Sequence, residues 1–95
     1  MSKNAKKWVN NMFINKAADG SNNLCGDVVA ARRKALGFSQ RELADRLQLM
    51  GMEIDKNGVQ RMEAGKRFVT DIELVFLSRS LDLSFETLLK QENER

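Results

Sequence analysis

Residues 39–65 decide the fold, and they read SQRELADRLQLMGMEIDKNGVQRMEAG. Ser39 is followed three residues later by Glu42, which is the spacing of a capping box. In that motif the serine accepts from the third helical amide and the glutamate reaches back to the cap. Leu43 and Leu47 then fall on one face at helical spacing, and Gly51 marks the end of the apolar pattern. We therefore predict a helix from Ser39 to about Gly51.

A second short helix is predicted directly after this one. Asp55 is its expected N-cap, and Val59 and Met62 give it one narrow apolar stripe. Gly65 stands where a helix commonly ends in a left-handed residue. The rest of the surface is polar and consists of Lys56, Asn57, Gln60 and Arg61.

Those four side chains are of the types that pair bidentately with base edges. Arginine or lysine suits guanine, and asparagine or glutamine suits adenine. A solvated helix face has a similar composition, however, so composition alone leaves both interpretations open. Gly58 is likewise open to two interpretations: close approach to a nucleic-acid backbone, or simple weakening of the helix.

The ordered motifs resemble the helix-turn-helix of the Xre/Cro family of phage-repressor-like DNA-binding domains. The similar segments are SQRELA, the aliphatic residue and cap at Ile54 and Asp55, and VQRMEAGKR. The resemblance extends from about Leu24 to Leu89 and includes Gly26, Val29, Arg33, Gly37, Ser39, Gln40, Leu43, Ala44, Glu63, Gly65 and Leu81. The connection LQLMGMEID departs from the pattern, because it is several residues longer than the commonest turn of the family.

The resemblance implies an all-α, compact five-helix domain whose helix 56–64 enters the major groove of double-stranded DNA. Lys56, Asn57 and Arg61 match the positions that most often read bases in the family, and the exposed face adds Gln60. It also implies an ion pair between Arg33 and Glu63, two positions that pair in the family. The alternative for that pair is two solvated charges.

Phosphate contacts are expected at both ends of the predicted motif. Gln40 and Arg41 begin the first of its helices, where free amides also favour anions. Lys66 and Arg67 follow the second helix directly. Arg41, like Lys34, is equally well explained as a solvated charge.

Three more helices complete the expected core. The first spans Leu24–Leu36, is capped near Asn22 or Asn23, and ends at Gly37; its apolar contacts are Val28, Val29, Ala31 and Leu36. The next begins with Thr70 and Glu73, a second capping-box pair, and carries Ile72, Leu74, Val75, Phe76, Leu77 and Leu81 as core residues. Ser84 is expected to cap the last, which contains Phe85, Leu88 and Leu89.

The N-terminal extension, residues 1–23, precedes the expected domain at 24–90 and a solvated tail at 91–95. Its apolar residues recur at a spacing compatible with one extra helix: Ala5, Trp8, Val9, Met12, Phe13 and Ala17. Three roles stay open, namely docking on the core of the same chain, forming a dimer interface, or following the DNA backbone through its lysines. Residues 19–23 are expected to form a turn.

Composition limits the class of protein. Ninety-five residues suffice for one domain and a modest core. The sequence has no histidine, tyrosine or Gly-rich phosphate loop, so we expect no enzyme, no metal and no cofactor. The single cysteine, Cys25, is expected to be buried, with a reactive thiol as the alternative, and a lone cysteine fits the reducing cytoplasm. No apolar run is long enough to cross a membrane, and no signal peptide is evident.

Charge is distributed unevenly along the chain. Residues 24–67 carry nine Lys or Arg against six acidic residues, whereas residues 68–95 carry three against six. The positive part therefore coincides with the motif, as an electrostatic footprint for phosphates requires.

We accordingly predict a transcriptional regulator, more specifically a repressor, that binds an inverted repeat as a homodimer with half-site centres about 10 bp apart. The N-terminal segment or the last helix around Phe85 and Leu88 would supply the dimer interface. The alternative is an antitoxin-like module whose main partner is another protein, such as a toxin.

Overall fold

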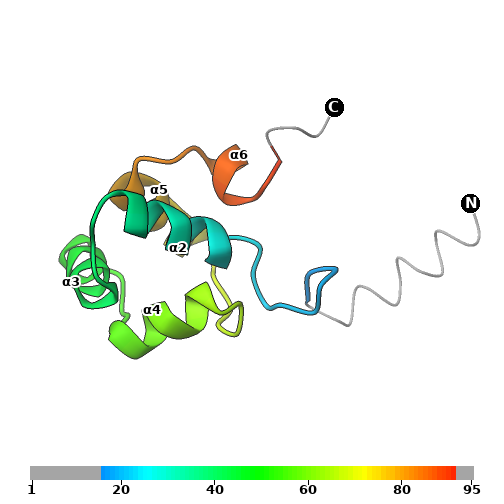
Figure 1. Cartoon of the computed structure of the whole chain (residues 1–95), viewed down its shortest axis with the longest axis horizontal. Helices are drawn as coiled ribbons and strands as arrows, with labels where there is room; N and C mark the ends of the chain where they lie inside the picture. Colours follow the sequence, from blue (N-terminus) through cyan, green and yellow to red (C-terminus); the bar gives the residue numbers. More distant parts are fainter. Residues whose placement is uncertain (1–15, 92–95) are drawn as a thin grey trace, which may run out of the picture.

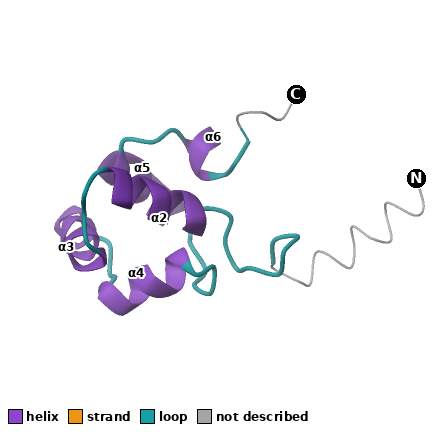
Figure 2. Cartoon of the chain, in the orientation of Figure 1, coloured by secondary structure: helices purple, strands orange, loops and turns teal. Residues whose placement is uncertain are grey.

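The described part of the chain consists of five α-helices joined by loops. The computed structural model describes residues 16–91. In chain order the helices are α2 (Gly26–Ala35), α3 (Gln40–Met50), α4 (Lys56–Glu63), α5 (Asp71–Leu81) and α6 (Phe85–Leu88). No strand occurs within residues 16–91 (Figure 1, Figure 2), and the predicted all-α class and five-helix core are confirmed for that range. The helix predicted around Trp8 and Phe13, and residues 92–95 of the tail, lie outside the described residues.

Side chains that cap helices determine where four of the five begin. Ser39 Oγ accepts from the Glu42 amide at 3.0 Å, and the Glu42 carboxylate accepts from the Ser39 amide at 2.8 Å. The same reciprocal pair starts α5 with Thr70 and Glu73. Asp55 caps α4 and Ser84 caps α6. All four predicted caps are confirmed, because capping depends on neighbours within three residues.

The first core helix is shorter than predicted. Its expected range was Leu24–Leu36, whereas α2 spans Gly26–Ala35. Asn23 Oδ1 accepts from the Gly26 amide at 2.9 Å, so one of the two predicted capping residues does satisfy a free amide of the first turn. Gly37 has a φ of 80°, which ends the helical path as expected.

The hydrophobic core is formed by side chains from all five helices and from the α3–α4 connection. Val59 and Met62, the predicted apolar stripe of α4, are both 0% exposed. The buried apolar residues are Cys25, Val29, Leu43, Ala44, Leu47, Met52, Ile54, Val59, Met62, Leu77, Leu81 and Leu88.

Three residues predicted to be core lie at the surface instead. Ile72 is 65% exposed, because it lies about 180° around the helix axis from the fully buried Leu81. Ala31 is exposed for the same reason, being about 200° from Val29. Leu36 follows the last residue of α2 and is 38% exposed.

The last helix contributes to the core more than to the surface. Leu88 is 0% exposed and Phe85 is 47% exposed. Leu88 is therefore unavailable for a dimer contact, and the predicted interface around these two residues is reduced to Phe85 on α6.

Helix α2 lies at the centre of the arrangement. It contacts α4 on one side and α5 and α6 on the other, and α3 packs against both α4 and α5 (Figure 1). Helices α3 and α4 therefore form one side of the molecule. Within residues 16–91, no helix has the length and apolar character needed to span a membrane.

Candidate nucleic-acid interface

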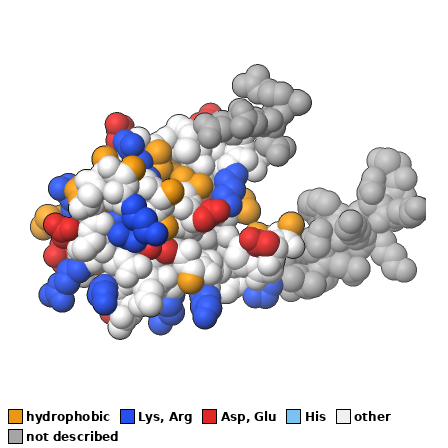
Figure 3. All heavy atoms as spheres, in the orientation of Figure 1, with side chains coloured by type: hydrophobic (Ala, Val, Ile, Leu, Met, Phe, Trp, Pro, Cys, Tyr) orange, Lys and Arg blue, Asp and Glu red, His pale blue; other side chains and the backbone are white. Residues whose placement is uncertain are grey.

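Helix α4 has one buried face and one exposed face. Gly58, Val59 and Met62 are buried. Val59 and Met62 were the predicted apolar stripe, and Gly58 lies four residues before Met62 on the same side of the helix. The four candidate base-contacting residues are all exposed: Lys56, Asn57, Gln60 and Arg61. Figure 3 shows Lys and Arg side chains along the edge of the molecule that α4 forms in Figure 1. The exposed side of α4 is thus polar and basic, and none of these four side chains makes a hydrogen bond or an ion pair with another residue in the described part of the chain.

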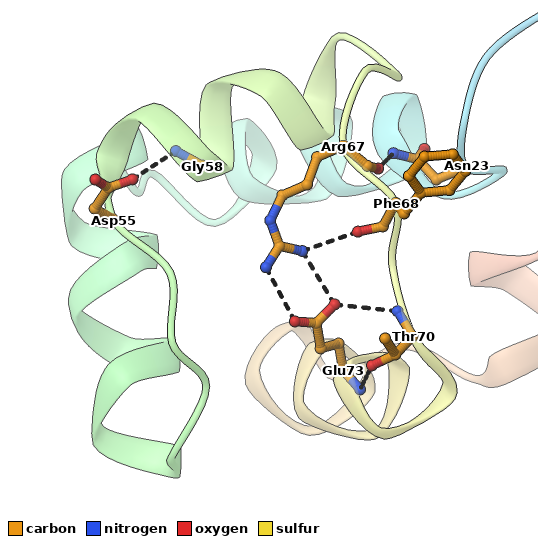
Figure 4. A network of polar contacts seen from close by, with 7 residues as sticks. All are labelled: Asn23, Asp55, Gly58, Arg67, Phe68, Thr70 and Glu73. Atoms are coloured by element: carbon orange, nitrogen blue, oxygen red, sulfur yellow. Dashed lines mark hydrogen bonds and ion pairs between the residues drawn. The ribbon is translucent and has the colours of Figure 1, made fainter.

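Gly58 belongs to the buried face of α4. A Cβ at this position would lie 2.7 Å from Cγ1 of Ile54 and 3.3 Å from Oδ1 of Asp55. The Gly58 amide also donates to Asp55 Oδ1 at 2.7 Å (Figure 4). The interpretation that Gly58 approaches DNA is therefore wrong; the glycine is required by the close packing of Ile54 against the first turn of α4.

The long connection between α3 and α4 is fixed by its own side chains. Gly51 reverses the chain with a φ of 106°. Met52 and Ile54 are 2% and 7% exposed, and so act as two apolar anchors. Gln48 Nε2 donates to the Ile54 carbonyl oxygen at 2.6 Å. The extra residues of this turn therefore hold the start of α4 in a defined place relative to α3.

Glu63, the last residue of α4, connects three helices. The Arg33 Nε donates to Glu63 Oε2 at 2.6 Å, and a second guanidinium nitrogen donates to Oε1 at 3.1 Å. Both side chains are about one-tenth exposed, and hydrogen bonding to Glu63 raises the pKa of Arg33 above its ordinary value. Gln40 Nε2 adds a third donor at 3.0 Å. The two residues paired by resemblance are thus in contact, and their carboxylate also binds the first residue of α3.

The four candidate phosphate-contacting residues fall into two groups. Arg41 and Lys66 are exposed. Gln40 is held by Glu63 as described above. Arg67 donates to both carboxylate oxygens of Glu73 at 3.0 Å, and also to the Phe68 carbonyl oxygen at 3.1 Å (Figure 4).

The Arg67–Glu73 pair stabilises the loop between α4 and α5. Both side chains are 19% exposed, and hydrogen bonding from Arg67 lowers the pKa of Glu73. Glu73 simultaneously completes the capping box with Thr70. Much of the Arg67 charge is therefore directed at α5 within the same chain.

A hollow between α3 and α4 lies beside the exposed face of α4. Its lining residues are Arg41, Ala44, Asp45, Gln48, Asp55, Lys56 and Asn57. The hollow brings candidate residues of both helices together, which the sequence pattern alone did not establish.

Two contacts near this surface were missed by the sequence analysis. The Arg46 guanidinium lies 4.0 Å from the centroid of the Phe38 ring, a cation–π arrangement that joins α3 to the loop before it. Asn22 and Asn23 bond to the end of α4 and to the loop after it. Their partners are 39 to 44 residues away, so no local pattern could have indicated them.

The fold and the exposed helix together define a helix-turn-helix protein: α3 and α4 pack against each other, and α4 presents a polar face. Comparison with known families agrees, since residues 29–88 match the Helix-turn-helix family, and the chain belongs to that family of Xre/Cro-like domains. The match covers more than half of the 95 residues. Membership makes the chain a DNA-binding regulatory protein in the general sense. No curated protein and no solved structure matches the chain significantly.

Proposed function

We propose that the chain is a sequence-specific transcriptional repressor that binds double-stranded DNA as a homodimer on an inverted repeat. The observation that carries this proposal is the exposed polar face of α4: its four side chains make no hydrogen bond to another residue of the described range, while the opposite face is fully buried. Such a protein acts in the cytoplasm, on DNA, without catalysing a reaction.

In the proposed complex, α4 lies in the major groove with its N-terminal turn foremost. Lys56, Asn57, Gln60 and Arg61 read base edges. Arg61 suits guanine, and the two amide side chains suit adenine.

Phosphates are bound on either side of that helix. Arg41 and Lys66 are exposed and need no rearrangement. Gln40 contributes mainly through its position at the start of α3, where the helix has free amides. Arg67 contributes only if it also keeps its bond to Glu73, since an unpaired Glu73 would be a mostly buried charge without a partner.

Dimerisation follows from the size of the site. One eight-residue helix contacts too few base pairs for useful discrimination in a genome, and two copies on half-sites about 10 bp apart double the readout. Phe85 of α6 and the segment before residue 16 are the candidate interfaces.

The test is selection of bound duplexes from a random pool at near-physiological salt, followed by titration of the best site. An Arg61→Ala variant is compared with Arg79→Ala, which removes an exposed arginine of α5. We expect an enriched inverted repeat, a loss of about 1–3 kcal/mol with relaxed preference at one position for Arg61→Ala, and no change for Arg79→Ala.

Absence of any enriched sequence, with weak and equally salt-sensitive binding to every duplex, would refute sequence-specific recognition. Co-purification of a second, different chain at fixed stoichiometry would instead favour the antitoxin-like alternative. Within the described residues, the exposed acidic side chains of Asp71, Asp82 and Glu86 are candidate contacts for such a partner.

A further inference from the structure

The residues just before α2 bind the end of α4, the helix proposed to read DNA and called the recognition helix below. Asn23 Nδ2 donates to the Met62 carbonyl oxygen at 3.1 Å and to the Arg67 carbonyl oxygen at 2.7 Å. Asn22 Nδ2 donates to the Lys66 carbonyl oxygen at 2.9 Å. The Met62 carbonyl oxygen also accepts from the Gly65 amide at 3.0 Å, whereas the carbonyl oxygens of Lys66 and Arg67 belong to the loop after α4, beyond the helical hydrogen bonds.

Backbone contacts strengthen the same junction. The Asn22 amide donates to the Gly65 carbonyl oxygen at 2.7 Å. A Cβ on Gly65 would lie 2.8 Å from Cβ of Ser21, and a Cβ on Gly26 would lie 2.3 Å from the Met62 carbonyl oxygen. The two segments therefore touch at distances that only glycine permits, and the junction has little room to shift.

The chemistry of Asn23 suits this position in a way that few side chains can match. Its amide nitrogen supplies two N–H donors, and its oxygen accepts from the Gly26 amide at 2.9 Å. One side chain thus joins the start of α2, the end of α4 and the loop that leads to α5. Figure 4 shows Asn23 bonded to the Arg67 carbonyl, while the Arg67 side chain reaches Glu73.

Helix α4 needs such support because it is short. Eight residues form about two turns, a length at which an isolated helix is marginal in water. Its start is held by Asp55 and by the buried Ile54. Its end is held by Glu63 and by the Asn22–Asn23 segment.

We propose that Asn22 and Asn23 are positioning residues for DNA recognition: they fix the C-terminal end of α4, and thereby the place at which Arg61 meets the base edges. The inference rests on the proposed function for its role in DNA reading. Discriminating contacts need their supporting residues to hold the geometry within about 0.5 Å, so loss of this support should reduce selectivity as well as affinity.

The first test uses Asn23→Asp, which is nearly the same size. A carboxylate can still accept from the Gly26 amide, but it cannot donate to two carbonyl oxygens and is repelled by them. We expect operator affinity to fall up to about tenfold, because binding must then reorder an α4 end that has lost two supporting hydrogen bonds. The preference for the operator over a site with one changed base pair should shrink as well. Asn22→Ala removes the side-chain bond to the Lys66 carbonyl oxygen and the bond that Asn22 Oδ1 accepts from Lys16. Only the first of these reaches the end of α4, so this variant should give a smaller effect in the same direction, and it serves if Asn23→Asp does not fold.

The matched control is Ser78→Ala. It removes one side-chain bond, from Ser78 Oγ to the Leu83 carbonyl oxygen, and lies on α5 away from this junction. Both variants are assayed at a temperature where circular dichroism shows more than about nine-tenths folded protein, with affinities corrected for the folded fraction. A purely structural role predicts an unchanged site preference in both, whereas positioning predicts a reduced preference in Asn23→Asp alone.

A second measurement needs no DNA. The amides of Ala64, Gly65 and Lys66 close the end of α4. We expect these amides to exchange with solvent faster in Asn23→Asp, while the Val29 amide in α2 keeps its wild-type rate. Unchanged exchange at α4 together with an unchanged site preference would overturn the proposal. If the wild type selects no operator, the proposed function falls, and the exchange rates alone decide whether the two asparagines position α4.

Discussion

Replacement of Glu63 by glutamine should be among the most damaging polar substitutions in this domain. The Glu63 carboxylate receives three donors, two from Arg33 and one from Gln40, at 2.6, 3.1 and 3.0 Å. Glutamine has the same shape but keeps one acceptor oxygen, and its NH₂ group faces donors instead. Arg33, whose side chain is only 10% exposed, then has no counter-charge, and it retains its bond to the Phe38 carbonyl oxygen and at most one neutral bond to the glutamine oxygen.

The expected cost is about 3 kcal/mol of unfolding free energy. Hydrogen bonds to charged groups contribute about 1.5–3 kcal/mol each, and removal of one partner of a buried pair costs about 3–5 kcal/mol. The lower end applies because both side chains retain slight solvent access. For a domain of this size, such a loss lowers the melting temperature by about 10–20 °C.

The assay is urea denaturation followed by circular dichroism, with the wild type and Glu86→Gln as references. Glu86 is an exposed glutamate on α6, so its substitution should stay within about 0.5 kcal/mol. A double-mutant cycle with Arg33→Met measures the coupling directly, and we expect at least 1 kcal/mol, roughly the lower range for contacting residues. If the unfolding free energy of Glu63→Gln lies within about 0.5 kcal/mol of the wild-type value, the three contacts do not stabilise the fold.

Three further predictions concern packing and titration. Gly26→Ala should destabilise the domain by about 1–3 kcal/mol in urea, because the new Cβ would lie 2.3 Å from the Met62 carbonyl oxygen; wild-type stability would contradict that close approach. Burial raises the pKa of the Cys25 thiol to about 11, so in the folded protein this thiol should react with thiol reagents only at the rate at which the fold opens. The unfolding free energy of the wild type should fall as the pH rises above about 9, where the unfolded thiol ionises first, and that of Cys25→Ala should fall less steeply. The hydrogen bond from Arg67 lowers the pKa of Glu73, so this group stabilises the fold above its ordinary pKa of 4.5, and that stability is lost as the pH falls through the lowered pKa. Glu73→Gln should therefore weaken the loss of stability on acidification, and an unchanged loss would rule out the Arg67–Glu73 pair as its source.

Local chemistry explains which parts of the fold could be predicted. Ser39, Asp55, Thr70 and Ser84 each act on an amide three residues ahead, so sequence spacing contains the whole interaction. The buried stripe of α4 could be predicted in the same way, from the spacing of Val59 and Met62. Gly58 stands four residues before Met62 and shares its face, so the same spacing argument would have placed it inside.

Predictions of core residues were wrong where residue type was used in place of position around the helix. Ile72 is apolar, yet helical spacing puts it opposite the core-facing Leu81. The prediction that Arg67 contacts a phosphate stays untested, but spacing did not indicate its pair with Glu73, which lies six residues away on the next helix. The predicted capping role of Asn23 agrees with its bond from the Gly26 amide, whereas its two bonds to Met62 and Arg67 join segments too distant in the sequence for a local pattern to indicate.

The position of the Glu63 carboxylate determines how substitutions there would reduce the amount of folded protein. Because the end of α4, the start of α3 and the last turn of α2 meet at one side chain, loss of the Glu63 contacts weakens three helices at once, whereas the bonds that the Asn22 and Asn23 side chains donate reach only the end of α4 and the loop after it. A Glu63 variant should therefore unfold in one all-or-none transition and contain a smaller population of native molecules. In a cell, substitutions at Glu63 would then be observed as reduced protein abundance and, for the proposed repressor, as a dose-dependent loss of repression.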